Sequence, residues 1–109
     1  MGAHRTLSPG LAAVLEAIAS EVNYGFDIMD RTGLPSGTVY PALGRLQQLG
    51  YVRSSWERQR VAAREKRPAR RYYELTDAGR AALLEAAEQY RNLARLVAER
   101  LDGLDPSRA

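Results

Sequence analysis

The stretch GTVYPALGRLQQLGYV, at residues 37–52, decides the fold of this chain. Its large apolar residues follow one another at steps of four, three and three: Val39, Leu43, Leu46 and Leu49. These steps place the four side chains on one face of a helix that packs on a core. Gly50 then ends the helix, because glycine readily adopts the left-handed conformation found there. The pattern predicts a helix from Ser36, as N-cap, to Leu49 that leads directly into a strand.

Pro41 lies inside this predicted helix. Proline has no backbone N–H, so beyond the first turn it costs the helix about one hydrogen bond. A start near Thr38 instead of Ser36 would bring Pro41 closer to the first turn. The sequence leaves both starts open.

A second stretch, KRPARRYYELT at residues 66–76, completes the pattern. Alternation of apolar and polar residues predicts strands at residues 51–57 and 71–75, with Tyr73 and Leu75 on one face of the second strand. In the first strand, we expect Val52 and Trp56 to point inward. The two strands would pair as an antiparallel hairpin around a polar, basic connection at residues 58–70.

Two helices are expected upstream. Ser8 and Pro9 begin the first, in which apolar residues recur at helical spacing: Leu11, Val14, Leu15 and Ile18. The second spans about residues 26–32, with three candidates for burial, Phe26, Ile28 and Met29, and ends at Gly33.

A long helix is expected at residues 77–101, with Thr76 as its cap. Its apolar residues alternate at steps of four and three: Leu83, Ala87, Tyr90, Ala94, Val97, Leu101 and Leu104. This heptad pattern fits either cover for the wing within the same chain or pairing with a second copy. The length of the pattern favours a dimer.

The order helix, helix, helix, strand, basic connection, strand, helix predicts an α+β, mostly α, winged helix-turn-helix. With 109 residues, the chain is long enough for one domain of this kind. We expect residues 1–75 to form a winged helix-turn-helix DNA-binding domain, and residues 76–109 to form a dimerisation helix and tail.

Positive charge is concentrated in the predicted wing. Residues 53–71 hold eight basic and two acidic residues, although the whole chain has a formal net charge of only +3. Such a segment fits either a solvated loop or a directed contact with a polyanion such as DNA.

Several of these motifs together resemble the PadR-like family of transcriptional regulators. The matching segments are YGFDI at residues 24–28, GTVYPAL at 37–43, GYV at 50–52 and RRYYELT at 70–76. The single helix after the wing is similar to the short subfamily in which that helix builds the dimer. The chain departs from the family pattern at Asn23, at Gly44 and in an Arg- and Ala-rich wing without a glycine-rich tip.

The resemblance implies a homodimeric, sequence-specific DNA-binding regulator of transcription, a repressor that binds a pseudopalindromic operator in double-stranded DNA. In the helix at residues 36–49, it places phosphate or base contacts on Thr38 and Tyr40. Ser36 and Arg45 are further candidates on the exposed face of this helix. In the wing, the basic side chains are candidates for flanking phosphates or a narrow minor groove: Arg58, Arg60, Arg64, Lys66, Arg67 and Arg70.

The resemblance also implies an effector, because regulators of this family often sense aromatic or drug-like compounds between the dimer halves. Four residues would line such an effector pocket here, or else plain core: Leu11, Leu15, Tyr90 and Val97. We expect no cofactor and no metal, because the chain has no cysteine and a single histidine, His4. No cluster of residues suggests catalysis, so we expect a protein that is not an enzyme.

No apolar run is long enough to span a membrane and no signal peptide is visible, which predicts a cytoplasmic protein. Two rival functions remain at this point: a winged-helix adaptor that binds proteins and not DNA, and a small-molecule-binding protein that has lost DNA recognition.

Overall fold

The computed structural model describes residues 7–104. Residues 1–6, with His4, and residues 105–109, at the end of the predicted tail, lie outside this range. The elements follow the order of a winged helix-turn-helix: α1 (Pro9–Ala19), α2 (Gly25–Thr32), α3 (Ser36–Gln48), β1 (Val52–Trp56), α4 (Gln59–Arg64), β2 (Arg71–Leu75) and α5 (Asp77–Leu104).

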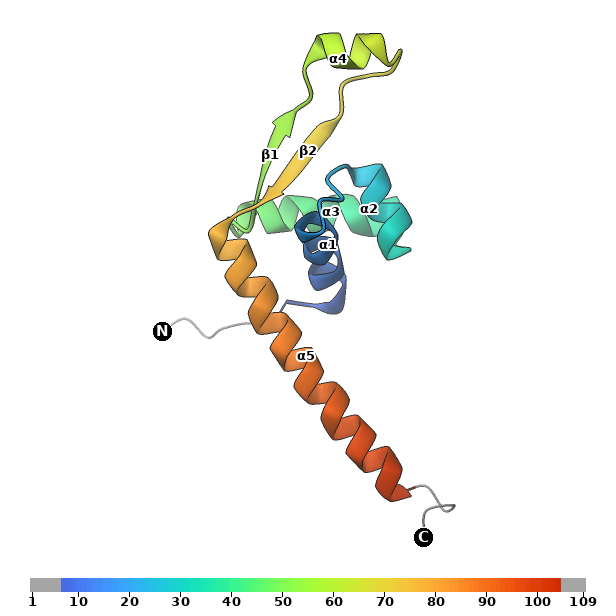
Figure 1. The fold of residues 1–109 in the computed structure, drawn as a ribbon, viewed down its shortest axis with the longest axis vertical. Helices are drawn as coiled ribbons and strands as arrows, with labels where there is room; N and C mark the ends of the chain where they lie inside the picture. Colours follow the sequence, from blue (N-terminus) through green and yellow to red (C-terminus); the bar gives the residue numbers. More distant parts are fainter. Residues whose placement is uncertain (1–6, 105–109) are drawn as a thin grey trace.

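The hairpin and α5 extend in opposite directions from a compact group of α1, α2 and α3 (Figure 1). Strands β1 and β2 pair antiparallel, with Val52 opposite Leu75 and Trp56 opposite Arg71. Helix α4 sits at the far tip of the hairpin, while the distal half of α5 runs free of the rest of the domain. This arrangement confirms the predicted fold class, including its long C-terminal helix.

One apolar core joins all the major elements. Its buried side chains come from α1, α2, α3, the hairpin, α5 and the residue Leu7 before α1: Leu7, Val14, Leu15, Ala17, Ile18, Ile28, Val39, Ala42, Leu43, Leu46, Val52, Tyr73 and Ala86. The predicted stripes of α1 and α3 therefore do face the core, except that Leu49 is 37% exposed at the end of α3. Burial of such side chains is the main force that holds the three helices together.

The predicted helix ends are confirmed at three places. The Oγ of Ser8 accepts a hydrogen bond from the amide of Leu11 at 3.2 Å, and so caps α1. Gly33 closes α2 with a φ of +72°, in the left-handed region that favours glycine. The Oγ1 of Thr76 accepts from the amide of Gly79 at 3.0 Å and caps α5.

The start of α3 differs from both predictions. Pro35 is the N-cap, because its carbonyl accepts from the amides of Thr38 and Val39 at 2.9 and 3.0 Å. Ser36 is the first helical residue and not the N-cap, so that prediction is wrong. A start near Thr38 is wrong as well, and Pro41 lies inside the helix without an N–H to donate.

Two aromatic side chains expected inside are outside. Phe26 is 74% exposed, because α2 turns Ile28 and Met29, but not Phe26, toward the core. Trp56 is 64% exposed, because β1 has by then left the domain and there is no core beneath its end.

Several boundaries also differ, and α3 ends at Gln48, one residue before the predicted end. Strand β1 is one residue shorter at each end than predicted, and α5 continues to Leu104. The connection at residues 58–70 is not irregular throughout, since it contains α4, whose residue Ala62 is buried. Alternation and charge gave no sign of this helix, because its six residues are too few to show a periodic apolar stripe.

Candidate nucleic-acid interface

Helix α3 divides cleanly into a buried and an exposed face. Val39, Ala42, Leu43 and Leu46 pack on the core. The rest of its surface is exposed and includes the four predicted contact residues: Ser36, Thr38, Tyr40 and Arg45. A helix anchored on one side by apolar packing and polar on the other is suited to enter a DNA groove.

The ring of Tyr40 lies directly against a glycine of α2. A Cβ on Gly25 would lie 2.6 Å from Cε1 of the Tyr40 ring, so only a residue without a side chain lets the ring lie so close. Tyr40 remains 52% exposed. The close approach fixes the ring while leaving part of it available to a ligand.

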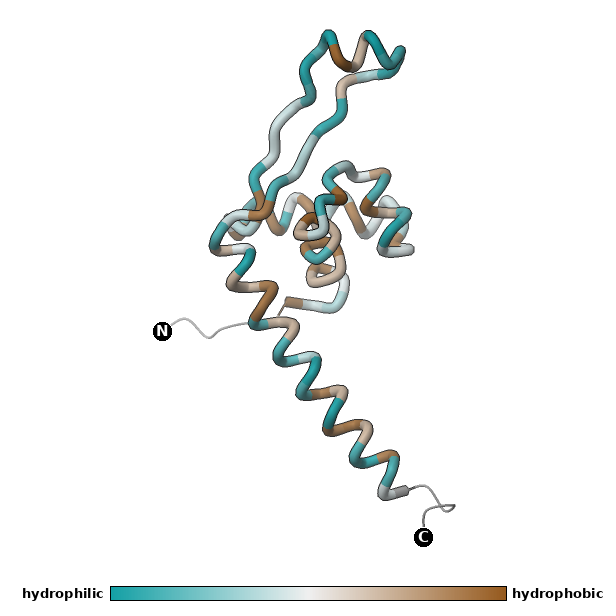
Figure 2. The backbone as a smooth tube through the Cα atoms, viewed as in Figure 1, coloured by the Kyte–Doolittle hydropathy of each residue, from teal (hydrophilic) through white to brown (hydrophobic). Residues whose placement is uncertain are grey.

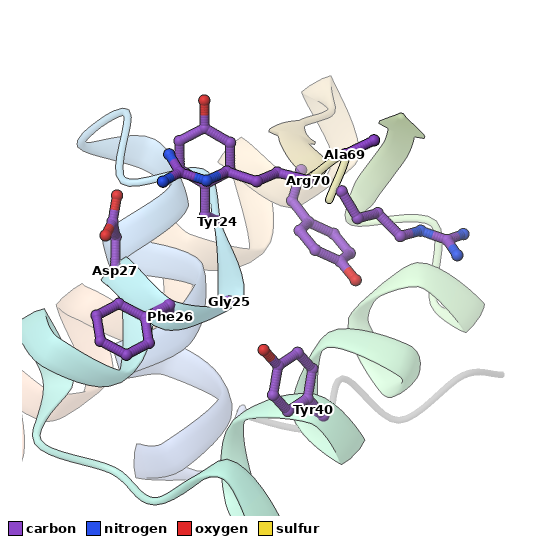
Figure 3. A pocket seen from close by; sticks show the side chains of 9 residues that line it. Tyr24, Gly25, Phe26, Asp27, Tyr40, Ala69 and Arg70 are labelled. Atoms are coloured by element: carbon purple, nitrogen blue, oxygen red, sulfur yellow. The ribbon is translucent and has the colours of Figure 1, made fainter. Parts of the chain in front are cut away.

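Tyr40 also lines a hollow between α2, α3 and residues 69–73 of the wing (Figure 3). In that view, Tyr40 rises from α3 on one side of the hollow, while Tyr24 and Arg70 lie on the other. The hollow has a volume of about 280 Å³. Nine residues line it: Tyr24, Gly25, Phe26, Asp27, Tyr40, Ala69, Arg70, Arg71 and Tyr73. It brings the predicted contact residues Tyr40 and Arg70 together.

The wing is attached to the helices through the backbone of β2. The side-chain amide of Asn23 donates to the carbonyl of Tyr73 at 2.6 Å, and the amide of Tyr73 donates to the carbonyl of Asn23 at 3.1 Å. The loop before α2 therefore extends the edge of the hairpin. This gives Asn23, one of the departures from the family pattern, a role in setting the angle of the wing.

A buried carboxylate organises the base of the wing loop. The side chain of Glu57 is 3% exposed, and its oxygens accept from both terminal nitrogens of Arg67, at 2.5 and 2.8 Å. The backbone amide of Arg70 and the hydroxyl of Tyr72 donate to the same carboxylate at 3.3 and 3.2 Å. The hydrogen bonds from Arg67 hold the pKa of Glu57 at about 2, even though burial acts to raise it.

This ion pair changes the expected role of Arg67. Its guanidinium binds a buried partner in the described structure and is placed to brace the wing, while its predicted contact with a phosphate stays a prediction. Sequence reasoning could not find this role, because Glu57 and Arg67 meet only when the wing loop closes.

The side chain of Arg70 is exposed, and its guanidinium stacks on the ring of Tyr24. Its guanidinium carbon lies 4.5 Å from the centre of the Tyr24 ring. The hydroxyl of Tyr24 donates to that of Tyr72 at 2.8 Å, and Tyr72 donates onward to Glu57. The pKa of Tyr72 is raised to about 12, first by its hydrogen bond with Tyr24 and then by burial. This chain of bonds links the start of α2 to the wing.

The other predicted wing contacts lie in α4 or directly beside it. Arg58, Arg60, Arg64 and Lys66 are all exposed at the tip of the hairpin. They lie away from the hollow that Tyr40 and Arg70 share, so the structure separates the predicted DNA contacts into a central group and a tip group. Arg45, at the opposite end of α3 from Ser36, lines no part of the hollow.

The predicted dimerisation residues divide along α5. Leu83 and Tyr90 are half-buried and pack against the chain's own core, and the Tyr90 hydroxyl donates to the carbonyl of Leu7. Further along, Ala94, Val97 and Leu101 are exposed, as is Ala87. Brown, hydrophobic segments recur along this distal part of α5 (Figure 2). Leu93 and Leu96, which the heptad pattern omitted, are 54% and 49% exposed there.

The four predicted effector residues are not brought together. A nearly apolar groove of about 350 Å³ runs between α1 and α5, and Tyr90 is the one of the four that lines it. Leu15 is fully buried in the core, Leu11 is half-buried against it, and Val97 lies farther along α5. The groove is lined instead by Pro9, Ala12, Ala13, Glu16, Leu83, Ala86, Ala87 and Tyr90.

Within residues 7–104, no three or more His, Cys, Asp or Glu side chains are grouped so that they could hold a metal ion. None of the helices in this range combines the length and apolar character needed to cross a bilayer.

Comparisons with known proteins agree with this architecture. A family model described as the transcriptional regulator PadR-like family matches residues 14–85. Among solved structures, a PadR family transcription regulator from Clostridium difficile superposes with a TM-score of 0.70 at 22% identity, covering 84% of this chain and 97% of that one. A PadR-like transcriptional regulator from Bacillus cereus gives 0.69 at 23% identity, covering 84% and 89%.

A third similar structure is BpsR from Bordetella bronchiseptica, whose DNA binding is described as regulated by 6-hydroxynicotinic acid. It has a TM-score of 0.63 at 21% identity, covering 94% of this chain and 71% of that one. A comparison with curated protein sequences found no match.

The family and the fold support a DNA-binding regulator of transcription. Because the family model matches well over half of its residues, this chain belongs to the PadR-like family of transcriptional regulators.

Proposed function

We propose that this protein is a homodimeric, sequence-specific transcriptional repressor that binds a pseudopalindromic operator and is released by a small-molecule effector. The observation that carries the DNA-binding part is the shared hollow. Tyr40 of α3 and Arg70 of the wing line one concave surface. A duplex lying across this surface would meet the helix and the wing at once.

In this proposal, α3 enters the major groove. Thr38 and Tyr40, on its exposed face, contact phosphates or base edges, and Arg45 contacts a phosphate or a guanine edge. The amide groups at the start of α3, beside Ser36, carry partial positive charge and suit a phosphate. The exposed cations around α4 follow the flanking backbone, where they supply affinity without reading sequence.

Dimerisation is proposed to use the distal half of α5. Leu93, Leu96, Val97 and Leu101 are between 47% and 60% exposed in the single chain. So many large apolar side chains on one free helix are typical of a surface that a partner covers. A two-fold dimer would place two α3 helices about 34 Å apart, the spacing of successive major grooves on one side of a duplex.

An effector is proposed to bind in the groove between α1 and α5. Its lining is almost entirely apolar, with the ring of Tyr90 available for an aromatic or drug-like compound. BpsR, a similar structure, is described as responding to an aromatic acid. Because α5 would also carry the dimer interface, a compound that shifts it against α1 would change the spacing of the reading helices.

A binding titration tests this function. Purified protein is titrated against the intergenic duplex beside its own gene and against a random duplex of equal length, at several salt concentrations. We expect selective binding of the intergenic duplex that weakens with salt, and a footprint over an inverted repeat. Equal affinity for both duplexes at low salt would contradict sequence-specific regulation. Binding of a protein partner without any DNA affinity would favour the adaptor instead.

A further inference from the structure

We infer that Trp56 and Arg71 form a further contact of the wing with one DNA strand, in which the guanidinium binds a phosphate and the indole packs on the adjacent deoxyribose. Neither residue was among the contacts expected from the sequence. This inference rests on the proposed DNA-binding function and adds two binding residues to it.

The two side chains form a preassembled pair. Trp56 and Arg71 lie directly opposite each other in the hairpin. The guanidinium carbon of Arg71 is 5.3 Å from the centre of the Trp56 ring, and its Nη2 donates to the Oγ of Ser54 at 2.8 Å. A guanidinium held by stacking and one hydrogen bond keeps further N–H donors for a phosphate.

The pair lies on the face of the hairpin that looks toward α3. Side chains alternate between the two faces of a strand, so Arg71 shares a face with Tyr73. Tyr73 and Arg71 both line the hollow, together with Tyr40 of α3. Trp56 continues this face outward, toward the tip of the wing. A strand of DNA that leaves the groove occupied by α3 would pass this pair next.

The chemistry of this face suits a sugar–phosphate backbone. The paired residues on it are Val52 with Leu75, Ser54 with Tyr73, and Trp56 with Arg71, and none is acidic. Glu74, in contrast, belongs to the opposite face, across from Arg53. A single exposed aromatic residue is ordinary on a protein surface. What points to DNA is an exposed indole stacked with a cation, inside the most basic segment of the chain.

The experiment uses Trp56 as its own reporter, since it is the only tryptophan in the chain. Emission of the full-length protein is followed while the intergenic duplex from the footprinting experiment is added. We expect a change in emission that saturates with the same dissociation constant as a gel-shift titration. Arg71→Ala should weaken binding about five- to tenfold and reduce the slope of log affinity against log salt by about one.

Matched variants distinguish a specific contact by Trp56 and Arg71 from a general effect of positive charge on DNA binding. Arg53→Ala removes an exposed arginine from the opposite face of the same hairpin and should change affinity less than about twofold. Arg71→Lys should recover the salt slope but only part of the affinity, because lysine lacks the planar fork. Trp56→Ala should weaken binding, and Trp56→Phe should restore part of it. Thermal melting checks that each variant is folded.

The outcomes are distinct. If the wild-type protein binds the duplex but Trp56 emission stays constant and Arg71→Ala behaves like Arg53→Ala, the inference is overturned and the proposed function stands. If Trp56 emission changes with protein concentration in the absence of DNA, the pair belongs to a protein interface, which also overturns it. If no duplex is bound by the wild-type protein, the proposed function itself fails.

Discussion

Arg67 places both terminal nitrogens of its guanidinium on the carboxylate of Glu57, at 2.5 and 2.8 Å, and so closes the base of the wing loop. The same carboxylate accepts from the amide of Arg70 and the hydroxyl of Tyr72. One acidic side chain thus connects the end of β1, the connection after α4 and the start of β2. We therefore expect the conformation of the wing to depend on this residue.

Glu57→Gln should therefore loosen the wing. The substitution removes the negative charge but leaves Arg67 half-buried and without its ionic partner. We expect the melting temperature to fall by about 5 °C or more. Affinity for operator DNA should fall as well, because Arg70 is held next to the same carboxylate. Differential scanning calorimetry and a gel-shift titration measure the two effects.

Glu65→Gln is the matched control, because Glu65 is an exposed carboxylate at the end of α4 in the same wing. It should leave the melting temperature within about 2 °C of the wild-type value. Equal melting temperatures for the two variants would contradict an organising role for Glu57.

The stability of the protein should depend on pH through the carboxylate of Glu57. The pKa of Glu57 is about 2 in the folded chain, below its ordinary value of 4.5. Its contribution is therefore complete above about pH 4.5 and is lost as the pH falls toward 2. The difference in melting temperature between the wild-type protein and Glu57→Gln should be constant from pH 8 to pH 6 and shrink between pH 4.5 and pH 2. A difference that is unchanged at pH 2.5 would argue against this origin.

Gly25→Ala should impair DNA binding by displacing Tyr40. The new Cβ would lie 2.6 Å from the Tyr40 ring, so the ring must move. We expect a loss of operator affinity similar to that of Tyr40→Ala, about tenfold, without global unfolding. Gly44→Ala is the control in α3, because a Cβ there meets nothing within 4 Å. It should stabilise the helix by about 0.5–1 kcal/mol. Normal DNA binding by Gly25→Ala would show that the position of Tyr40 is unimportant.

Arg45→Ala and Tyr40→Ala should weaken operator binding through different parts of α3. A cation that binds a guanine edge contributes about 1–3 kcal/mol of discrimination, so Arg45→Ala should also relax sequence preference at one position in each half-site. Loss at a phosphate contact would lower affinity for all sequences equally. Titration of the variants against operators mutated one base pair at a time distinguishes the two roles, and unchanged binding by both variants would remove α3 as the reading element.

Val97→Lys should disrupt the proposed dimer. Val97 is 47% exposed in the single chain, next to the similarly exposed Leu93 and Leu101. A charge buried without a partner in an apolar interface costs several kcal/mol. Sedimentation equilibrium should therefore give a mass near 12.1 kDa for the variant and about twice that for the wild-type protein. Arg100→Ala, an exposed change of the same helix, should remain dimeric. A monomeric wild-type protein would contradict the dimer.

The order of the elements, apart from α4, could be predicted because it depends on interactions between near neighbours. The caps at Ser8, Gly33 and Thr76 involve residues within four positions of one another, and the apolar stripe of α3 repeats within its own helix. Such short-range features are written directly in the residue order. They were enough to predict a winged helix-turn-helix and the exposed face that carries Tyr40.

The details of the site were decided by contacts between distant residues. Glu57 meets Arg67 only after the wing closes, and Gly25 meets Tyr40 only after α2 packs on α3. Whether Trp56 points inward depended on where the core ends, which no local pattern records. Charge along the sequence located the basic wing, but only the tertiary structure decided which cations are paired and which face the space beside α3, because burial and pairing are properties of the closed chain.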